Sequence, residues 1–417
     1  MPRVLLLMTT TTYRAHDFLA AARRLGIEAV VGSDREHTLT DLTPGRTLGL
    51  DFLHPQQGTE AILDLARNRP LDAIVAVDDD GALVAATASQ VLGLPHNSVA
   101  SVYAARNKHR MRQMLAEAGV PVPQFWCFPT DIDPTIAAHQ IRFPCVVKPL
   151  FLSASRGVIR ADNATQFHVA FQRLCALLCL PQVMERGGPL AQQLLVETFI
   201  PGKEVALEGL LIHGHLRVLA VFDKPDPLDG PFFEETLYVT PSRLSAAVQE
   251  DIATCTTRTA QALGLHQGPV HAELRVNDAG PWMLEMAPRS IGGLCSRTLR
   301  FGPGLSLEEL ILQQAVGVDP TAHARESKAS GVMMLPIPHR GILHTVHGQE
   351  AAKQVPGVED LTITIPLGQE VIPLPEGDRY LGFLFARHDS PAEVEAALRE
   401  AYRRLDLVIT PLKTSAG

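Results

Sequence analysis

The sequence predicts a protein of mixed α/β and α+β class, built of three parts in chain order. Residues 1–97 alternate short apolar runs with helical patterns, which is typical of a parallel sheet covered on both faces. Residues 98–325 contain alternating apolar and polar runs joined by tight turns, and these indicate antiparallel hairpins. Residues 326–417 repeat strand and helix patterns on a smaller scale and predict a small α/β cap.

The composition is that of a soluble globular protein. Hydrophobic residues make up 46% of the 417 residues and charged residues 20%, and this length has room for about three domains. No segment comes near the roughly 20 consecutive apolar residues of a membrane span. The first apolar run, at residues 4–8, is too short for a signal peptide and leads into a threonine tract. We therefore expect a cytoplasmic protein with no membrane partner.

Charge and cysteine content exclude further classes. The net charge is −8, and basic residues gather only in pairs such as Arg23 and Arg24, whereas nucleic-acid binding needs a concentrated basic face. The six cysteines form no CxxC pair, so neither a zinc site nor a disulfide framework is indicated. Nucleic acid is therefore not an expected partner.

The first 97 residues predict a sheet with a ligand site at one edge. Strands are expected at residues 4–8, 29–31 and 73–77, and helices at residues 13–25, 59–68 and 81–92. The turn after the first strand has no glycine where a dinucleotide-binding GxGxxG motif needs three, so we do not expect NAD or FAD. Asp78, Asp79 and Asp80 follow a strand, at the carboxyl edge where open α/β sheets bind ligands. Alternatively, Asp80 caps the helix that begins near Gly81.

A hairpin at residues 269–293 is the candidate site around which the rest is organised. The register that buries both of its apolar sets pairs Val276 with Trp282, Leu274 with Leu284 and Ala272 with Met286. The same register sets Glu273 opposite Glu285, with Cβ atoms about 5 Å apart, where like charges are destabilising. A hard cation such as Mg²⁺ would neutralise the pair, and Arg289 would hold a further anion. The alternative is a solvated hairpin face with a salt-bridging arginine.

Two lysines precede this hairpin. Lys108 lies in a helix expected at residues 101–119. The basic residues of this helix, Arg112 among them, spread round it, so surface solvation is expected to explain most of the cluster. Lys148 ends a β-rich run, FPCVVKP, and is expected to line a cleft or be buried. The small residues that follow, within residues 150–162, form a loop whose backbone N–H groups can approach a phosphate. Alternatively, this loop is an ordinary hairpin turn.

Residues 193–211 form another hairpin pattern, about a PG turn. Glu197 precedes the turn and Glu204 follows it. Such a segment can offer its backbone to an adenine edge and a carboxylate to ribose hydroxyls, as acidic residues do in other nucleotide sites. Taken alone, the pattern is merely a hairpin. On a later strand, Glu234 or Glu235 could meet a substrate ammonium group, although strand glutamates are more often solvated.

Taken in order, these residues resemble the ATP-grasp superfamily. Its members bind ATP between two α+β lobes and ligate a carboxylate to an amine, or carboxylate a substrate, through an acyl-phosphate. The resemblance covers roughly residues 100–320 and implies central ATP-grasp lobes with a lid subdomain at about residues 130–195. It implies ATP and Mg²⁺, or Mn²⁺, as cofactors and small-molecule carboxylate and amine substrates. A homodimer would be in keeping with the family.

The resemblance also implies residue roles. The residues implied to bind ATP are Lys108, Lys148, Ser153, Ser155, Gly157, Glu197, Thr198, Phe199, Ile200 and Glu204. In this set the lysines contact the phosphates, the serine and glycine loop closes over them, and the remainder contact adenine and ribose. Glu273 and Glu285 would hold the metal, while Arg289 and Lys148 would act in catalysis, with Arg289 stabilising the acyl-phosphate and the tetrahedral adduct.

The sequence departs from the family in two places. The family commonly has ExNxR at the second metal-binding strand, whereas this chain has Ala287 at the asparagine position, which argues against a full two-metal site. The lid loop is also poorer in glycine than usual.

The C-terminal parts suggest which kind of member this is. Gly292, Gly293 and Arg297 follow Arg289 in a loop suited to a substrate carboxylate. Strands are expected near residues 331–337, 361–365 and 380–386, before a helix at residues 391–405. This combination resembles L-amino-acid ligases of the dipeptide-forming kind and carnosine-synthase-like enzymes, with Glu235 as a substrate residue. The alternatives are a biotin-carboxylase-like or purine-pathway enzyme that uses bicarbonate or formate, and a nucleotide-binding module without chemistry.

Overall fold

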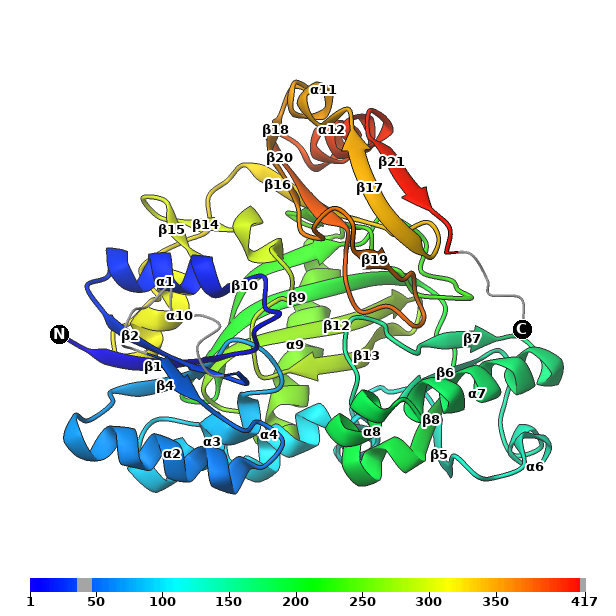
Figure 1. The fold of residues 1–417 in the computed structure, drawn as a ribbon, viewed down its shortest axis with the longest axis horizontal. Coiled ribbons are helices and arrows are strands. Elements are labelled where there is room, and N and C mark those ends of the chain that lie inside the picture. Colours follow the sequence, from blue (N-terminus) through cyan, green and yellow to red (C-terminus); the bar gives the residue numbers. More distant parts are fainter. Residues whose placement is uncertain (36–46, 413–417) are drawn as a thin grey trace.

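The computed structural model describes residues 1–35 and 47–412, and its N-terminal part contains the expected parallel sheet (Figure 1). The strand order is β3-β2-β1-β4, with parallel pairing throughout. The elements are β1 Arg3–Met8, α1 Ala15–Arg24, β2 Glu28–Ser33, β3 Thr47–Gly49, α2 Pro55–Asn68, β4 Ala73–Ala76 and α3 Ala82–Leu92. Val4, Leu6 and Met8 share a core with α1, whereas Leu5 and Leu7 share one with α2 and α3. Both faces of the sheet are therefore covered, although β3 was not predicted.

The helix expected at residues 101–119 is two helices. They are α4 Val99–Arg106 and α5 Lys108–Glu117, and the extended backbone of Asn107 separates them. The side chain of Asn107 caps α5 by accepting a hydrogen bond from the Arg110 N–H at 3.2 Å. The break makes Lys108 the first residue of α5, where its N–H donates to the Leu150 carbonyl at 2.9 Å. A side-chain cap within an otherwise helical pattern thus fixes the position of a predicted site residue.

The centre of the molecule is an antiparallel sheet with the order β13-β12-β9-β10-β11-β16-β20-β18. Its strands are β9 Lys203–Ile212, β10 His215–Asp223, β11 Leu237–Thr240, β12 Gly268–Asn277, β13 Gly280–Ala287, β16 Ala329–Leu335, β18 Val358–Ile363 and β20 Gly382–His388. The helix α9 Ala246–Leu263 packs with α5 on one face, against Val270, Ala272 and Leu274 of β12. Because side chains alternate along a strand, His271 and Glu273 point to the opposite face.

The hairpin of β12 and β13 confirms half of the predicted register. Ala272 pairs with Met286, and Glu273 lies opposite Glu285, as predicted. A bulge after Glu273 then shifts the pairing, so that Leu274 lies opposite Met283 and not Leu284. The prediction for the distal half was wrong because it assumed an unbroken ladder, whereas the bulge buries the Met283 side chain completely.

The C-terminal part extends the central sheet. Its strands β16, β18 and β20 continue that sheet from β11. The remaining elements of this part are β17 Gly341–His347, α11 Gln349–Lys353, β19 Glu370–Val371, α12 Pro391–Arg403 and β21 Asp406–Thr410. Strands β19, β17 and β21 form a separate small sheet that was not predicted. Four short elements connect the centre to this part: η2 Cys295–Thr298, β14 Arg300–Phe301, β15 Leu305–Ser306 and α10 Leu307–Ala315.

A further four-stranded sheet, with the order β5-β8-β6-β7, lies at the side of the molecule and occupies the region expected to be the lid (Figure 1). Its elements are β5 Phe125–Pro129, α6 Pro134–Ala138, β6 Cys145–Pro149, β7 Ile159–Ala161, α7 Ala164–Leu178, α8 Pro181–Gly187, η1 Gly188–Gln192 and β8 Gln193–Thr198. Across the described ranges, no single helix is long and apolar enough to cross a membrane. The bent pair Ala164–Leu178 and Pro181–Gln192 passes that test only when taken together.

Replacing Phe383 of β20 by alanine is expected to lower the free energy of unfolding by about 3–5 kcal/mol, the usual cost of removing a fully buried ring. The ring packs edge-on against Tyr13, with centroids 5.2 Å apart, and so joins the N-terminal part to the central sheet. Urea denaturation measures the change. Val91→Ala, at a side chain that is 60% exposed, is the control. A loss below about 1 kcal/mol for Phe383→Ala would contradict this expectation.

Candidate active site

A cavity of about 420 Å³ lies where the three parts of the chain meet. Its walls come from β9, β12 and β13, from the lid sheet, and from the loops that follow β1 and β4. The predicted residues that line it are Lys108, Lys148, Ser153, Ser155, Glu197, Thr198, Phe199, Ile200, Glu204, Glu235, Glu273, Glu285, Arg289, Gly292 and Gly293. Gly157 and Arg297 lie outside this lining. The fold therefore brings most of the predicted set to one place.

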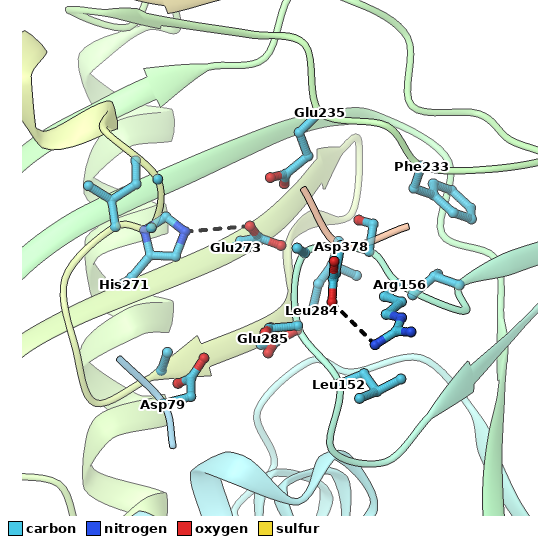
Figure 2. A pocket seen from close by; sticks show the side chains of 18 of the residues that line it. Asp79, Leu152, Arg156, Phe233, Glu235, His271, Glu273, Leu284, Glu285 and Asp378 are labelled. Atoms are coloured by element: carbon cyan, nitrogen blue, oxygen red, sulfur yellow. Dashed lines mark hydrogen bonds and ion pairs between the residues drawn. The ribbon is translucent and has the colours of Figure 1, made fainter. Parts of the chain in front are cut away.

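The facing carboxylates of Glu273 and Glu285 lie in the wall of the cavity (Figure 2). Nζ of Lys108 is 3.1 Å from Oε1 of Glu285. Oε1 of Glu273 is 3.3 Å from Nζ of Lys224 and 3.4 Å from Nε2 of His271. Burial opposes the charge on Glu273, but Lys224 and His271 outweigh it and hold the pKa of this carboxyl well below its ordinary value. Positive side chains thus compensate the like charges that the register brings together.

Lys224 is a buried charge that the sequence analysis missed. It follows β10, and its Nζ contacts Glu204 at 2.9 Å as well as Glu235 and Glu273. These three carboxylates each bring an oxygen within 4.8 Å of the others. Burial opposes the charge on Lys224, but the three carboxylates raise its pKa well above the ordinary value. In the sequence Lys224 is a single lysine after a strand, and its partners are distant in the chain, so no local signal could reveal it.

Of the two glutamates considered for a substrate ammonium group, Glu235 lines the cavity (Figure 2). Its pKa is raised to about 7, chiefly by burial and then by the charge of Glu273, while Lys224 acts in the opposite direction. Glu235 therefore changes its charge near neutral pH. Glu234 lies outside the lining.

The Glu197 carboxylate pairs with two basic side chains of the protein. It accepts a hydrogen bond from Nε of Arg112 at 2.5 Å and pairs with Nζ of Lys148 at 2.6 Å. Burial opposes its charge, but Arg112 and Lys148 outweigh this and lower the pKa of Glu197. Arg112 is fully buried, so the expectation that it is solvated was wrong. Because these contacts fix Lys148, its ammonium group is held at the cavity wall.

Two phenylalanines and an arginine form the wall beside Glu204. Phe199 and Phe233 stack with ring centroids 6.4 Å apart, and the Arg275 guanidinium lies 4.7 Å from the Phe199 centroid. Arg275 donates from Nε to Glu204 at 3.1 Å and from one terminal nitrogen to the Ile200 carbonyl at 3.0 Å. One buried cation that was not predicted therefore holds both Glu204 and the backbone at Ile200.

The small-residue loop after Lys148 is docked on the C-terminal part. Arg156 donates from Nε to the Glu376 carbonyl at 2.9 Å and pairs with Asp378 at 3.3 Å (Figure 2). The Gly157 N–H donates to the Pro375 carbonyl at 2.8 Å. This contact uses the Gly157 N–H outside the cavity lining, and the role of Gly157 toward the phosphates stays a prediction.

The acidic cluster at the carboxyl edge of the N-terminal sheet enters the cavity. A terminal nitrogen of Arg289 lies 2.9 Å from Oδ2 of Asp79. Burial opposes the charge on Asp79, but Arg289 outweighs it and lowers the pKa to about 2. Asp80 pairs with Arg186 of the lid at 2.8 Å. The alternative that Asp80 caps the next helix was wrong, since Gly81 precedes α3 and no side chain caps it.

Of the residues predicted after Arg289, the two glycines line the cavity and Arg297 does not. Gly293 has a φ of +60°, and a Cβ there would meet the Phe383 ring at 2.7 Å, so glycine is required. Arg297 donates from Nε to Asp17 of α1 at 2.9 Å and from a terminal nitrogen at 3.0 Å. The Arg297 guanidinium is therefore paired with Asp17 outside the cavity lining, and its contact with a substrate carboxylate stays a prediction.

His271 also lines the cavity and was not predicted as a site residue. Burial opposes the charge on its imidazole, but hydrogen bonds to Glu208 and Glu273 outweigh it and raise the pKa to about 9. At neutral pH the histidine is therefore a cation between two carboxylates. It occurs two residues before Glu273 on the same strand, a spacing that places both side chains on one face.

Family models match segments in all three parts of the chain. Residues 19–96 match a family model described as "ATP-grasp N-terminal domain". Residues 141–298 match "ATP-grasp domain", and residues 333–410 match "L-amino acid ligase C-terminal domain 2". The crystal structure of L-amino acid ligase from Bacillus licheniformis aligns with a TM-score of 0.84 at 24% identity, over 98% of this chain and 99% of that chain. The architecture is therefore the ATP-grasp fold.

Sequence relatives agree with the fold. Carnosine synthase 1 of Gallus gallus is 31% identical over 338 residues, which are 76% of this chain and 36% of that protein. Alanine–anticapsin ligase of Bacillus subtilis strain 168 is 24% identical over 273 residues, which are 62% of this chain and 56% of that protein. The aligned part is thus well under two thirds of the length of either relative. The chain belongs to the ATP-grasp superfamily and carries the C-terminal domain described for L-amino acid ligases.

The stability contributed by His271 is expected to disappear as the pH rises through about 9. Its pKa is about 9 in the folded protein against an ordinary 6.5, so between these values the folded state binds a proton that the unfolded state lacks. Stability therefore falls with rising pH, by about 3 kcal/mol in total. Urea denaturation of the ligand-free protein and of His271→Asn, across this window, measures the effect. The stability difference should narrow with rising pH, and a constant difference would contradict the assignment.

Proposed function

We propose that this chain is an ADP-forming, ATP-dependent carboxylate–amine ligase that activates an amino acid as an acyl-phosphate. The observation that carries the proposal is the facing pair Glu273 and Glu285, with Lys108, Lys148 and Arg289 around the same cavity. Opposed acids beside several cations are suited to a metal-bound polyphosphate. The names of the two relatives, a carnosine synthase and an alanine–anticapsin ligase, support the formation of an amide bond between amino acids.

ATP would lie between the lid sheet and β12–β13. Lys108 and Lys148 would contact its phosphates, and Ser153 and Ser155 would close over them. The adenine would meet the backbone from Glu197 through Thr198 and Phe199 to Ile200, and Glu204 would meet the ribose. The Phe199 and Phe233 side chains line the cavity beside Glu204 and support this placement, because they give the site an apolar wall.

The carboxylate donor set fits a hard divalent ion, Mg²⁺ or Mn²⁺, which Glu273 and Glu285 would hold. When bound, the ion would neutralise phosphate charge during transfer. Ala287 offers no side-chain oxygen at the position where asparagine is common, which supports fewer ligands than a full two-metal site.

The chain's own residues would act in two steps. In the first, a substrate carboxylate oxygen attacks the γ-phosphorus of ATP, the bond to the bridging β–γ oxygen breaks, and ADP leaves. Lys148 and Arg289 would neutralise the anions that this step brings together. In the second, the amine nitrogen attacks the acyl carbon, the bond to the phosphate oxygen breaks, and phosphate leaves while the nitrogen loses a proton. Arg289, oriented by Asp79, would stabilise the negative oxygen of the adduct.

The remaining residues would select and protect the substrates. Glu235 would bind the ammonium group of the amino acid, and the backbone at Gly292 and Gly293 would lie against its carboxylate. The docked loop at Arg156 would exclude water, which otherwise hydrolyses the acyl-phosphate. The match of residues 333–410 to an L-amino acid ligase domain favours an amino acid over bicarbonate or formate. A homodimer and a cytoplasmic location stay predictions from the sequence.

Purified protein with ATP, Mg²⁺ and pooled amino acids should release ADP and phosphate and form a dipeptide detectable by mass spectrometry. Glu285→Gln removes one charge of the facing pair and should lower kcat/KM at least about 100-fold, the usual size for a lost electrostatic group. Glu117→Gln, at an exposed glutamate that ends α5, is the control. Release of AMP in place of ADP would count against the proposal.

Glu235→Gln should raise KM for the amino acid about 10-fold or more and leave KM for ATP nearly unchanged, since it removes the charge proposed to meet the ammonium group. In the unmodified enzyme, that KM should rise as the pH falls below about 7, where Glu235 gains a proton. Initial rates across pH measure both effects. Equal KM changes for ATP and the amino acid would contradict this role.

A further inference from the structure

We propose that Glu208 and His271 are positioning residues that tie the Glu273 carboxylate to the backbone of residues 289–293. This inference rests on the proposed function, because it assumes that Glu273 holds the divalent ion and that this loop lies against the substrate. Glu208 and His271 are buried polar residues that have no role in the proposed mechanism.

Glu208 is the fixed end of the connection. It lies on β9 directly opposite His271 of β12, and its side chain is fully buried. The Ile291 N–H donates to both of its carboxylate oxygens, at 3.1 and 3.0 Å. Nδ1 of His271 lies 3.2 Å from Oε2. One carboxylate therefore holds both the loop backbone and the imidazole.

His271 carries the connection to the proposed metal site. Its Nε2 lies 3.4 Å from Oε1 of Glu273, the contact drawn as a dashed line in Figure 2. Carboxylates that are ionised only accept hydrogen bonds, so a ring that meets one at each nitrogen donates at both. Rotation of the ring would break both contacts, and the Glu273 carboxylate is therefore oriented before any ion arrives.

The loop is held from its other side as well. Arg14 of the N-terminal part donates to Oγ of Ser290 at 2.6 Å and to the Val77 carbonyl at 3.3 Å. Ser290 and Ile291 are thus fixed from two directions, directly before the glycines that line the cavity. Glu208 and His271 thus form a continuous hydrogen-bonded connection between the proposed metal ligand and a loop that Arg14 holds from the other side.

Packing alone does not explain this pair. Ala206 and Leu210, which flank Glu208 on the same face of β9, belong to a buried apolar core. A buried ionic pair often contributes no more stability than apolar residues of similar volume, so a well-packed apolar pair would serve the fold equally well. Partners that orient a metal-binding side chain, in contrast, are commonly worth 10- to 100-fold in metal affinity or activity.

The test uses the full chain with ADP bound and no turnover. Mn²⁺ binding to wild type, His271→Gln and Glu208→Gln is followed by electron paramagnetic resonance, with ADP affinity in the absence of metal as the internal reference. We expect the Mn²⁺ Kd to rise about 10-fold or more in His271→Gln and by a smaller factor in Glu208→Gln, which keeps an acceptor for Ile291. The metal-free ADP Kd should stay within about twofold. His215→Asn, at an exposed histidine that begins β10, is the control.

Steady-state rates give a second readout. Both variants should need more Mg²⁺ for half-maximal rate, and kcat should fall at saturating Mg²⁺ because the loop is no longer fixed, whereas a merely structural defect would weaken ADP binding too. If His271→Gln does not fold, the Mn²⁺ affinity and Mg²⁺ requirement of Glu208→Gln test the inference. Unchanged Mn²⁺ affinity and Mg²⁺ requirement in the folded variants would overturn the inference and leave the proposed function intact. Wild type that fails to bind Mn²⁺ with ADP and shows no turnover would instead overturn the proposed function.

Discussion

The opposition of Glu273 and Glu285 across one hairpin is the constraint on which the rest of the site depends. Two carboxylates at this spacing repel each other, and the repulsion grows where water is excluded. Three cations lie beside these carboxylates: Lys108 begins α5 and Lys224 follows β10, whereas His271 lies on the same strand as Glu273. Because no single element could supply all three, the cavity has to form where several elements converge. The same concentration of charge is what a nucleotide and its metal ion would require.

The position of Lys108 depends on backbone geometry. The break at Asn107 starts a new helix at Lys108, whose Nζ also donates to the Leu152 carbonyl at 2.8 Å. That carbonyl belongs to the segment leading into the docked loop, so one ammonium group touches both the loop and Glu285. Lys108 therefore links the backbone at the start of this loop to one of the two facing carboxylates.

The sequence was informative where the signal is local. Period-two patterns predicted the buried strand at β1 and the placement of Glu273 opposite Glu285, and these were confirmed. Prediction from the sequence failed where contacts between residues distant in the chain determine the surroundings of a side chain. The neighbours of Lys224 in the chain do not reveal that three carboxylates surround it. Arg112 likewise has the pattern of a surface residue of a helix, and only the fold shows that Glu197 of β8 pairs with it. The pairing of Arg297 with Asp17 could not be predicted for the same reason, since Asp17 lies far away in sequence.

The C-terminal residues were predicted as a cap, but three of their strands belong to the central sheet and bring residues of this part to the cavity. Strand β16 pairs with β11, the strand that begins just after Glu235, and β20 pairs with β16. This pairing places Phe383 of β20 against Gly293. Tyr380, just before that strand, lines the cavity, and the neighbouring segment receives the Gly157 N–H through Pro375. Residues of this part therefore border both the loop at residues 289–293 and the small-residue loop after Lys148. Because a Cβ at Gly293 would meet the Phe383 ring at 2.7 Å, a ring of the C-terminal part sets the shape of the loop at residues 289–293.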